Sequence, residues 1–519
     1  MIDLPDSSNL LKALLRIETY PDNPTSVDMV QTQMSFIFLT GKYVYKIKKP
    51  VNLGYLDYTT LENRKYFCYQ ELELNQRLCP HVYLEVIPIT ELKGRINLRG
   101  KGKIIEYTVK MKQLPGDRMM DYLLKESQVT GEMIQQVAQK MAGFHQNAGT
   151  NPEISSFGKL DAIMVNINEN SAQTEKYIDI SISPHEYQKI NEFNSKFTHD
   201  NQMLFKKRVN DDRIRDCHGD LHAAHVCFSE GVQIFDCIEF NDRFRYCDVA
   251  SEIAFLAMDL ERYEHAELGN LFVEYYVKYS GDKELYHLLN FYKCYRAYVR
   301  GKVESFKLDD RHMPRNELKK AAIAAKNYFH LAYRFTMSQP LLIIVSGLMG
   351  TGKTTIAESL HDNTGFTIVS SDVTRKKLAG IPITEHRFAE FDTGIYSPDF
   401  TQKTYQAILT EARTLLQQGK SVILDASFQR REDRNLAYLL ATELKSDFLI
   451  IECTLNEVEI KQRLEMRMSQ NSVSDGRWEI FRTQQAYFDK ITEFPSSQHL
   501  IIDTSQPIGN NVKTILERI

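Results

Sequence analysis

The sequence has 519 residues, which at about 100 to 200 residues per domain predicts two to four domains. A hydrophobic fraction of 43% with 25% charged residues is ordinary globular composition, and 24 Gly with 15 Pro excludes a collagen-like or low-complexity chain. The 64 basic and 68 acidic residues give a net charge of -4, so composition gives no reason to expect binding to nucleic acid or to an anionic membrane.

The N-terminal stretch MIDLPDSSNLLKALLRIETY does not have the pattern of an export signal. It has acidic residues where a secretory signal is basic, and it lacks an apolar segment followed by small residues. The most apolar run, Leu341 to Val345, is far shorter than the roughly 20 residues needed to cross a bilayer. The eight scattered cysteines are typical of reduced thiols in a cytosolic enzyme. We therefore expect a cytoplasmic protein with no membrane partner.

Residues 1–335 predict an α+β domain. Apolar and polar residues alternate over 35–49, 82–90 and 104–114, which is the pattern of strands with one buried face. Mostly helical patterns with a few short strands follow. This order predicts a small sheet-rich lobe before a larger helical lobe.

Two lysines lie two residues apart in the first strand pair, so Lys46 and Lys48 point to the same face. A helical segment with Glu71 follows them. A strand lysine paired with a glutamate on the next helix is the ion pair by which kinase-like folds fix the phosphates of ATP. We favour Lys46 as the nucleotide-binding lysine, with Lys48 second. A plain amphipathic strand with two solvated lysines is the alternative.

The stretch RIRDCHGDLHAAHV places Asp220 in a tight His-Gly-Asp turn, where its carboxylate could accept a proton from a hydroxyl. Asp236 and Glu239 follow near the next strand, and either could hold Mg²⁺. The histidines of this loop leave a metal-hydrolase site open as an alternative. A structural zinc site is a weaker one, because no CxxC accompanies the cysteines that recur every ten residues at Cys217, Cys227, Cys237 and Cys247.

A domain boundary is predicted at 336–340, where a charged helical pattern ends in TMSQP and the continuous apolar run LLIIVSG begins. From there, apolar strands alternate with helical patterns to residue 519. This rhythm predicts an α/β domain over 341–519 with a parallel sheet, joined to the first domain by a short linker.

The strongest motif is GLMGTGKT, which fits GxxxxGK[ST] between a predicted strand and a predicted helix. In such a loop successive backbone N–H groups face the phosphates, the lysine reaches the β and γ oxygens, and the threonine hydroxyl can bind Mg²⁺. The nucleotide-binding residues expected here are Gly347, Gly350, Thr351, Gly352, Lys353, Thr354 and Thr355.

Three further residues of this domain are candidates for catalysis or metal binding. Asp372 follows the second strand and could accept the hydroxyl proton of a substrate, while Arg375, about one helical turn later, could hold the substrate or the transferring phosphate. Asp425, near the end of the third strand, suits a role on Mg²⁺. The alternative for Asp372 and Arg375 is a helix cap followed by a solvated arginine. The alternative for Asp425 is an ordinary residue at the end of a strand.

A predicted lid follows the fourth strand. Arg463 and Arg467 stand four residues apart on one helix face, ahead of a polar loop. A closing segment of this kind excludes water and neutralises charge on a transferring phosphoryl group, so we expect Arg467 to act in catalysis. A solvated basic face is the alternative.

The motifs of the C-terminal domain resemble those of zeta-toxin-like and gluconate-kinase-like P-loop kinases, including polynucleotide 5′-hydroxyl kinases. These families share a phosphate loop, then D-x-x-R after the second strand, then a lid arginine. The resemblance covers roughly residues 340–519.

Residues 1–335 resemble the aminoglycoside-phosphotransferase and choline-kinase-like branch of the protein-kinase fold. The resemblance implies an adenine-facing hinge near Lys112 to Leu114. The family motif HGDxxxxN has its Mg²⁺-binding Asn where this sequence has His225. The usual IDFG aspartate matches Glu239 if Ile238-Glu239-Phe240 is the aligned segment, which leaves Asp236 displaced by three residues. The fused pair resembles bifunctional aminoglycoside phosphotransferase/ATP-binding proteins over nearly the whole chain.

We therefore expect an enzyme that uses ATP and Mg²⁺ to move the γ-phosphate to a hydroxyl of a small molecule. An alternative is a P-loop kinase whose N-terminal domain only binds a substrate or regulates, which His225 motivates. A nucleic-acid 5′-hydroxyl kinase is a lesser alternative, since the short basic stretch TRKK does not make an electrostatic groove.

Overall fold

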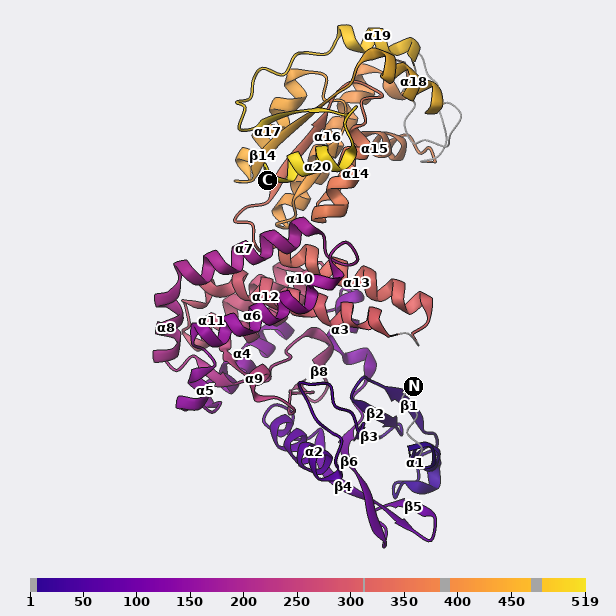
Figure 1. The fold of residues 1–519 in the computed structure, drawn as a ribbon, viewed down its shortest axis with the longest axis vertical. Helices are drawn as coiled ribbons and strands as arrows, with labels where there is room; N and C mark the ends of the chain where they lie inside the picture. The colour runs from indigo at the N-terminus through magenta and orange to yellow at the C-terminus, as the bar shows by residue number, and fades with distance from the viewer. Residues whose placement is uncertain (1–6, 311–312, 383–392, 468–477) are drawn as a thin grey trace. The chain divides into compact units, whose positions relative to one another are not determined.

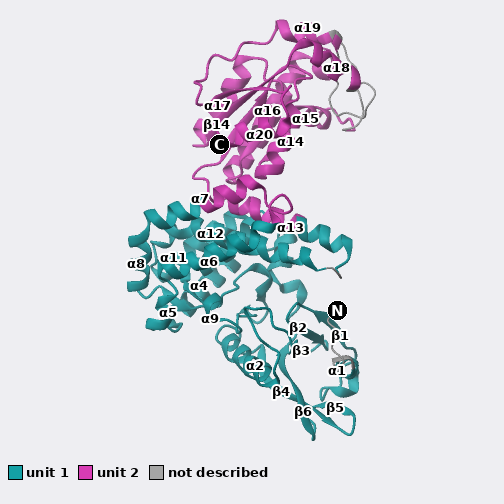
Figure 2. Cartoon of the chain, viewed as in Figure 1, with its two compact units in different colours: residues 1–176, 192–322 teal, residues 177–191, 323–519 magenta. Residues whose placement is uncertain are grey.

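The computed structural model describes residues 7–310, 313–382, 393–467 and 478–519 (Figure 1). The chain divides into two compact units, Met1–Lys176 with Glu192–Ala322, and Tyr177–Asn191 with Ile323–Ile519 (Figure 2). Helices α7 (Pro184–Asp200) and α13 (Arg315–Arg334) each contribute residues to both units. Over the described residues, no helix is long and apolar enough to span a bilayer.

The first unit begins with a six-stranded antiparallel sheet in the order β1-β2-β3-β6-β4-β5. Alternation along β3 sends Tyr45 and Ile47 into an apolar cluster with residues of β2 and α1, so the lysines on either side of Ile47 face the opposite side, where α2 packs. The elements of this lobe are α1 (Ser7–Leu14), β1 (Asp28–Gln31), β2 (Ser35–Leu39), β3 (Tyr43–Lys48), α2 (Leu61–Gln76), β4 (Tyr83–Leu92), β5 (Arg95–Leu98) and β6 (Lys103–Lys112).

The remainder of this unit is mainly helical, and its core lies between α4, α10, α11 and α12. Helix α10 is buried along nearly its whole length, which explains its almost continuous apolar sequence. The helices are α3 (Met120–Lys125), α4 (Gly131–Asn147), α5 (Pro152–Ser156), α6 (Leu160–Thr174), α8 (Gln202–Asn210), α9 (Asp242–Arg245), α10 (Val249–Arg262), α11 (Ala266–Ser280) and α12 (Leu285–Phe306).

Two short antiparallel pairs lie between α8 and α10. Strand β7 (Ile214–Asp216) pairs with β10 (Tyr246–Asp248), and β8 (Val226–Phe228) pairs with β9 (Val232–Ile234). The His-Gly-Asp turn joins β7 to β8 through the 3-10 turn Ala223–His225. These pairs therefore fix the two ends of the loop that carries Asp220.

The second unit has a five-stranded parallel sheet in the order β12-β13-β11-β14-β15. All six residues of the central strand β11 are buried, as expected for a strand covered by helices on both faces. Its elements are β11 (Leu341–Ser346), α14 (Lys353–Thr364), β12 (Thr367–Ser370), α15 (Ser371–Leu378), α16 (Pro398–Gln417), β13 (Val422–Asp425), α17 (Arg431–Glu443), β14 (Asp447–Thr454), α18 (Glu457–Arg467), α19 (Trp478–Ala486), β15 (His499–Asp503) and α20 (Ile508–Leu516).

The predicted fold class is confirmed. A sheet lobe and a helical lobe form the α+β first part, and a five-stranded parallel sheet with its helices forms the α/β second part. The predicted domain boundary at 336–340 stays a prediction.

Candidate functional site

Lys46 and Lys48 both form ion pairs with Glu71 in the sheet lobe. The Nζ atom of Lys46 lies 2.8 Å from Oε1 of Glu71, and that of Lys48 lies 2.7 Å from Oε2. Both lysines are on β3 and Glu71 is on α2, where it is fully buried. Glu71 therefore bridges the two lysines, and the predicted strand-to-helix ion pair exists for each of them.

The two lysines differ in their second partners. Lys46 binds Oδ1 of Asp236 at 2.6 Å, whereas Lys48 binds Glu239, which also accepts a hydrogen bond of 2.7 Å from the Tyr58 hydroxyl. The Lys48 side chain is only 1% exposed, while Lys46 is 13% exposed and its partner Asp236 is 40% exposed. Lys46 is therefore the one of the two that can reach a ligand, and Lys48 holds Glu239 inside the protein.

Lys46 and Asp236 stay charged because each stabilises the charge of the other. Burial alone would lower the pKa of Lys46, but the carboxylates of Asp236 and Glu71 outweigh it and hold that pKa well above its usual value. Burial alone would raise the pKa of Asp236. Lys46 together with His225 outweighs burial and holds this pKa well below its usual range. Both groups are therefore charged at neutral pH.

The His-Gly-Asp turn is set by Gly219 and by a buried carboxylate below it. Gly219 has φ +88°, and a Cβ there would lie 2.9 Å from the main-chain oxygen of Phe244. The N–H groups of His218 and Gly219 donate to Oε1 of Glu252 at 2.9 and 2.6 Å. Only glycine fits the turn, and Glu252 holds the backbone just before Asp220.

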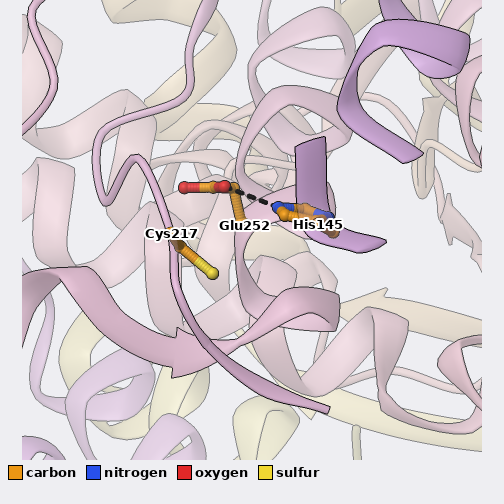
Figure 3. Close-up of side chains that lie close together, drawn as sticks. All are labelled: His145, Cys217 and Glu252. Carbon is orange, nitrogen blue, oxygen red and sulfur yellow. Dashed lines mark hydrogen bonds and ion pairs between the residues drawn. The ribbon is translucent and has the colours of Figure 1, made fainter. Parts of the chain in front are cut away.

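Glu252 belongs to a buried group with His145 and Cys217 (Figure 3). Its second oxygen lies 2.7 Å from Nε2 of His145, whose Nδ1 lies 2.8 Å from the Tyr276 hydroxyl. Burial raises the pKa of the Cys217 thiol well above its usual value, so this sulfur is protonated. Glu252 thus binds His145 and the N–H groups of His218 and Gly219. We interpret the group as a support for the backbone of the turn.

Asp220, His222 and His225 lie together at the open end of the turn. Oδ2 of Asp220 is 3.5 Å from Nε2 of His222, and the rings of His222 and His225 lie 3.9 Å apart between centroids. Burial opposes ionisation of Asp220, but the two histidines hold its pKa well below the usual range. The carboxylate is therefore ionised and close to the residues that follow it.

His225 faces Asp236 with an unprotonated nitrogen. Its Nδ1 donates to the main-chain oxygen of Asp220 at 2.9 Å, which leaves the Nε2 lone pair 3.6 Å from Oδ2 of Asp236. Burial and the neighbouring His222 lower the pKa of His225 to about 4, so the ring is neutral at pH 7. One imidazole nitrogen and one carboxylate oxygen thus point to the same place, which suits a divalent cation.

A cavity of about 1070 Å³ in the N-terminal unit opens onto these groups. Lys46, Asp220 and Asp236 line it together with residues of α6 and α12. Among the described residues, those of the predicted hinge at Lys112 to Leu114 are not part of its lining. One cavity therefore joins the charged cluster of β3 and the His-Gly-Asp turn to the helical lobe.

The four cysteines spaced by ten residues do not form a zinc site among the residues that the structure describes. The grouped ligand atoms are those of His145, Cys217 and Glu252, and those of Asp220, His222 and His225. Neither group contains a second cysteine. The thiol of Cys237 instead accepts a hydrogen bond from Arg77.

The phosphate loop of the second unit joins β11 to α14. Gly347, Gly350 and Gly352 have φ values of +142°, +78° and +85°. At Gly347 a Cβ would lie 2.5 Å from the main-chain oxygen of Cys453 in β14, so no side chain fits there. Thr351 is buried in the loop, where its hydroxyl donates to the Leu348 oxygen at 2.8 Å.

Lys353 and Thr354 begin α14 directly after the loop. The Lys353 ammonium donates to the main-chain oxygen of Leu348 at 2.9 Å, and the Thr354 hydroxyl donates to Oδ2 of Asp425 at 2.8 Å. The last residue of β12 pairs with Asp425 of β13, and Asp372 follows β12 at the same end of the sheet. Burial raises the pKa of Asp425, and the charge of Asp372 raises it further. The arrangement brings the predicted lysine, hydroxyl and acids to one end of the sheet.

Arg375 and Arg463, two arginines proposed from the sequence, bind main-chain oxygens in the structure. Arg375 is buried and donates to the main-chain oxygen of Ile395 at 2.6 Å and to the Thr401 hydroxyl at 3.1 Å, so here it supports the segment before α16. Arg463 donates to the main-chain oxygen of Thr504 at 2.8 Å. Arg467 is the last residue of α18, and its side chain lies outside the described residues.

A second, smaller cavity of about 500 Å³ adjoins the phosphate loop. Gly352 and Thr355 line it on the loop side, and Arg463, Thr504 and Asn511 line it on the other. Its position directly beside the start of α14 suits the nucleoside part of a nucleotide whose phosphates lie in the loop.

Sheet order and phosphate loop together define a P-loop nucleotide-binding domain in the second unit. The profile of the AAA domain family matches residues 342–491. The chain is also 30% identical over 449 residues to uncharacterized proteins of Mycobacterium bovis and Mycobacterium tuberculosis, which covers 86% of this chain and 87% of each relative. The chain therefore belongs to the same family as these mycobacterial proteins.

Solved structures are similar to parts of the chain. An amicoumacin kinase in complex with AMP-PNP, Ca²⁺ and Ami is 13% identical, covers 63% of this chain and 93% of its own, and has a TM-score of 0.38. A gluconokinase from Sinorhizobium meliloti is 19% identical, covers 34% of this chain and 91% of its own, and has a TM-score of 0.25.

Proposed function

We propose that the chain is an ATP-dependent phosphotransferase with one nucleotide site in each unit, each moving a γ-phosphate to a hydroxyl of a small molecule. The observation that carries the proposal for the N-terminal unit is Lys46, held between Glu71 and Asp236 on one wall of the cavity that also contains Asp220. For the second unit it is the phosphate loop with Thr354 bound to Asp425.

In the N-terminal unit, the ammonium of Lys46 neutralises phosphate oxygens of ATP while Glu71 keeps its side chain extended. Asp220 accepts a hydrogen bond from the acceptor hydroxyl and takes its proton as the new O–P bond forms, while the bond from the γ-phosphorus to the bridging oxygen breaks and ADP leaves. The buried Glu252 contributes by holding the backbone of the turn, so that the carboxylate does not have to be ordered at the moment of reaction.

A divalent cation fits between His225 and Asp236, where Nε2 and Oδ2 face each other at 3.6 Å. When bound, it would neutralise charge on the phosphates. Among the predicted metal ligands, Glu239 instead binds Lys48 and Tyr58, so we assign the metal to Asp236 and His225. This differs from the sequence alignment that matched Glu239 to the family aspartate.

In the second unit, the backbone of the loop and the start of α14 hold the phosphates, and Lys353 moves from the Leu348 oxygen to them. Thr354 and Asp425 are the residues that would hold Mg²⁺ there, because a hydroxyl and a carboxylate already meet at 2.8 Å. Asp372 takes the acceptor proton. Arg467 is proposed to close over the transferring phosphate from the end of α18.

One observation favours a second candidate function, in which the N-terminal unit only binds a substrate. His225 occupies the position of a metal-binding Asn in the resembled family, and imidazole is a poorer Mg²⁺ ligand than an amide oxygen. In that case the first unit would bind its ligand without transferring phosphate.

The test separates the two sites with single lysine variants. We expect full-length Lys353→Ala protein to retain saturable, metal-dependent binding of ATP in calorimetry, and the added substitution Lys46→Ala to abolish it. Lys377→Ala on α15 and Lys42→Ala before β3, both exposed, are the matched controls. If Lys353→Ala binds no ATP while the wild type binds one equivalent, the N-terminal unit is a binding module. Transfer of labelled γ-phosphate to a panel of hydroxyl compounds then identifies the acceptor class of each active site.

A further inference from the structure

The wall of the large cavity formed by α12 is basic. Arg296, Val299, Arg300 and Val303 line the cavity at three- and four-residue spacing, so one face of the helix forms this wall, with Lys302 at its edge. Because Asp220 lines the same cavity, the charge on this face bears on which phosphate acceptor the cavity can bind.

Lys302 is held by neutral groups. Its ammonium donates to Oδ1 of Asn170 at 2.6 Å and to Oε1 of Gln173 at 2.8 Å, both on α6. Among the described residues, no carboxylate forms an ion pair with it. Burial lowers the pKa of Lys302 to about 8, so the side chain is still mainly charged at neutral pH. The ring of Phe306 lies 5.6 Å from the ammonium, and the charge of nearby Glu169, which forms an ion pair with Arg243, partly offsets the effect of burial. A half-buried cation whose hydrogen-bond partners are amide oxygens is a site that an anion would complete.

Arg296 connects this face to the reacting carboxylate. Its guanidinium donates to the main-chain oxygen of Gly219 at 3.2 Å and to the Ser251 hydroxyl at 3.1 Å, and it lies over the ring of Phe255. Gly219 directly precedes Asp220. Lys302 lies six residues further along the helix, which is about 9 Å at the rise of an α-helix.

Arg300 lies between these two positions and acts on Asp220. It lines the same cavity as Asp220, and its charge contributes to the lowered pKa of the Asp220 carboxyl. The wall therefore presents positive charge from the reacting carboxylate to Lys302.

Most of the acidic residues of the cavity are already matched by basic ones. Glu169 binds Arg243, Asp309 binds Lys176 at 2.7 Å, and the buried Asp248 binds Arg208. Asp236 and Glu239 bind the two lysines of β3, Asp220 lies against two histidines, and Glu175 is exposed. An aminoglycoside, which is a polycation, would meet no unmatched buried carboxylate on the α12 wall.

We infer that the acceptor of the N-terminal unit is a hydroxyl compound with an anionic group, a phosphate or a carboxylate, bound by Lys302 about 9 Å along α12 from Arg296. This rests on the proposed function, since it gives the substrate class of that site. The hydroxyl lies at Asp220 and the anionic group lies at Lys302, as in a sugar phosphate or a sugar acid, which carry both groups in one molecule.

The first test uses inorganic sulfate as the probe and full-length Lys353→Ala protein, in which the phosphate loop no longer competes. We expect saturable sulfate binding in calorimetry that is at least about tenfold weaker in Lys302→Gln and restored in Lys302→Arg. Lys320→Gln, an exposed lysine of α13, is the matched control. Glutamine keeps a side chain that can bond Asn170 and Gln173, so the change removes charge with little loss of packing. No saturable binding, or binding unchanged by Lys302→Gln, overturns the inference.

The second test compares acceptors of one skeleton that differ in charge: gluconate, glucose 6-phosphate, glucose and glucosamine. Tighter binding of the two anions than of glucosamine, dependent on Lys302, supports the inference, and the reverse order overturns it. ATP binding is measured in the same variants. If sulfate and the anions bind through Lys302 while ATP does not bind, the proposed function fails and the anion site stands.

Discussion

Glu252 should contribute about 3 kcal/mol to the stability of the N-terminal unit through its charge. The perturbation is Glu252→Gln, which is a neutral analogue of the protonated glutamate. Burial raises the pKa of this carboxyl, but His145, His218 and the Gly219 N–H lower it in total from 4.5 to about 2. A difference of about 2.5 units at about 1.36 kcal/mol per unit gives about 3 kcal/mol, an order-of-magnitude value for a carboxylate that is fully buried.

The sign of the pH dependence follows from the same shift. Because the folded pKa is lower than the unfolded one, the stabilisation is fully present above about pH 4.5 and is lost as the pH falls toward 2. The wild type should therefore lose stability over this window, and Glu252→Gln should not show this part of the loss.

The assay is urea unfolding followed by circular dichroism, combined with amide hydrogen exchange read by mass spectrometry. Peptides covering β7 and the His-Gly-Asp turn should exchange faster in Glu252→Gln, while peptides from β11 keep their protection. Glu267→Gln, an exposed glutamate of α11, is the control. A stability loss below about 1 kcal/mol, or an unchanged exchange rate in the turn, would refute the assignment of Glu252 as its support.

Three further variants test the two sites. Gly219→Ala should destabilise the protein by about 1–3 kcal/mol more than Gly231→Ala in thermal unfolding, because both glycines have positive φ but only Gly219 has a main-chain oxygen where the Cβ must go; equal losses would contradict the packing argument. In a Lys46→Ala background, Thr354→Ala should weaken Mg-ATP binding at least about tenfold while Thr354→Ser retains it, since the Thr354 hydroxyl that donates to Asp425 is the group required. An equal loss in both variants would show that the hydroxyl is not needed. In Lys353→Ala protein, His225→Asn should shift ATP binding from a preference for Mn²⁺ toward Mg²⁺ in a metal titration, because it exchanges a nitrogen donor for an oxygen donor; an unchanged preference would remove His225 from the ligand set.

Local pattern was sufficient to predict the sheet lobe and its lysines. The two-residue alternation placed Lys46 and Lys48 on one face, and the structure shows both on the α2 side of β3. Spacing did not show which lysine can reach a ligand, because both bind Glu71. That difference comes from exposure, which depends on how Asp236 and Glu239 come back from a distant part of the chain.

Residues that act through long-range contacts could not be found from spacing. Asp236 has a left-handed backbone, with φ +63°, and the motif match of Ile238-Glu239-Phe240 gives no sign of this local geometry. Arg375 stands three residues after Asp372, yet it binds Ile395 and Thr401. Glu252 was missed because it lies in a helix whose apolar sequence indicates only a buried core.

The ion pair between Lys46 and Asp236 makes binding of a metal and binding of a nucleotide depend on each other. At the proposed sites, a cation at Oδ2 of Asp236 would neutralise the carboxylate that holds Lys46 through Oδ1, and a phosphate at Lys46 would neutralise the ammonium that holds Asp236. Both ligands would weaken the same ion pair, so whichever binds first lowers that cost for the second. Thermodynamic linkage then requires equal reciprocal effects. Each ligand should therefore bind more tightly in the presence of the other. Without either ligand, the ammonium of Lys46 and the carboxylate of Asp236 remain paired with each other.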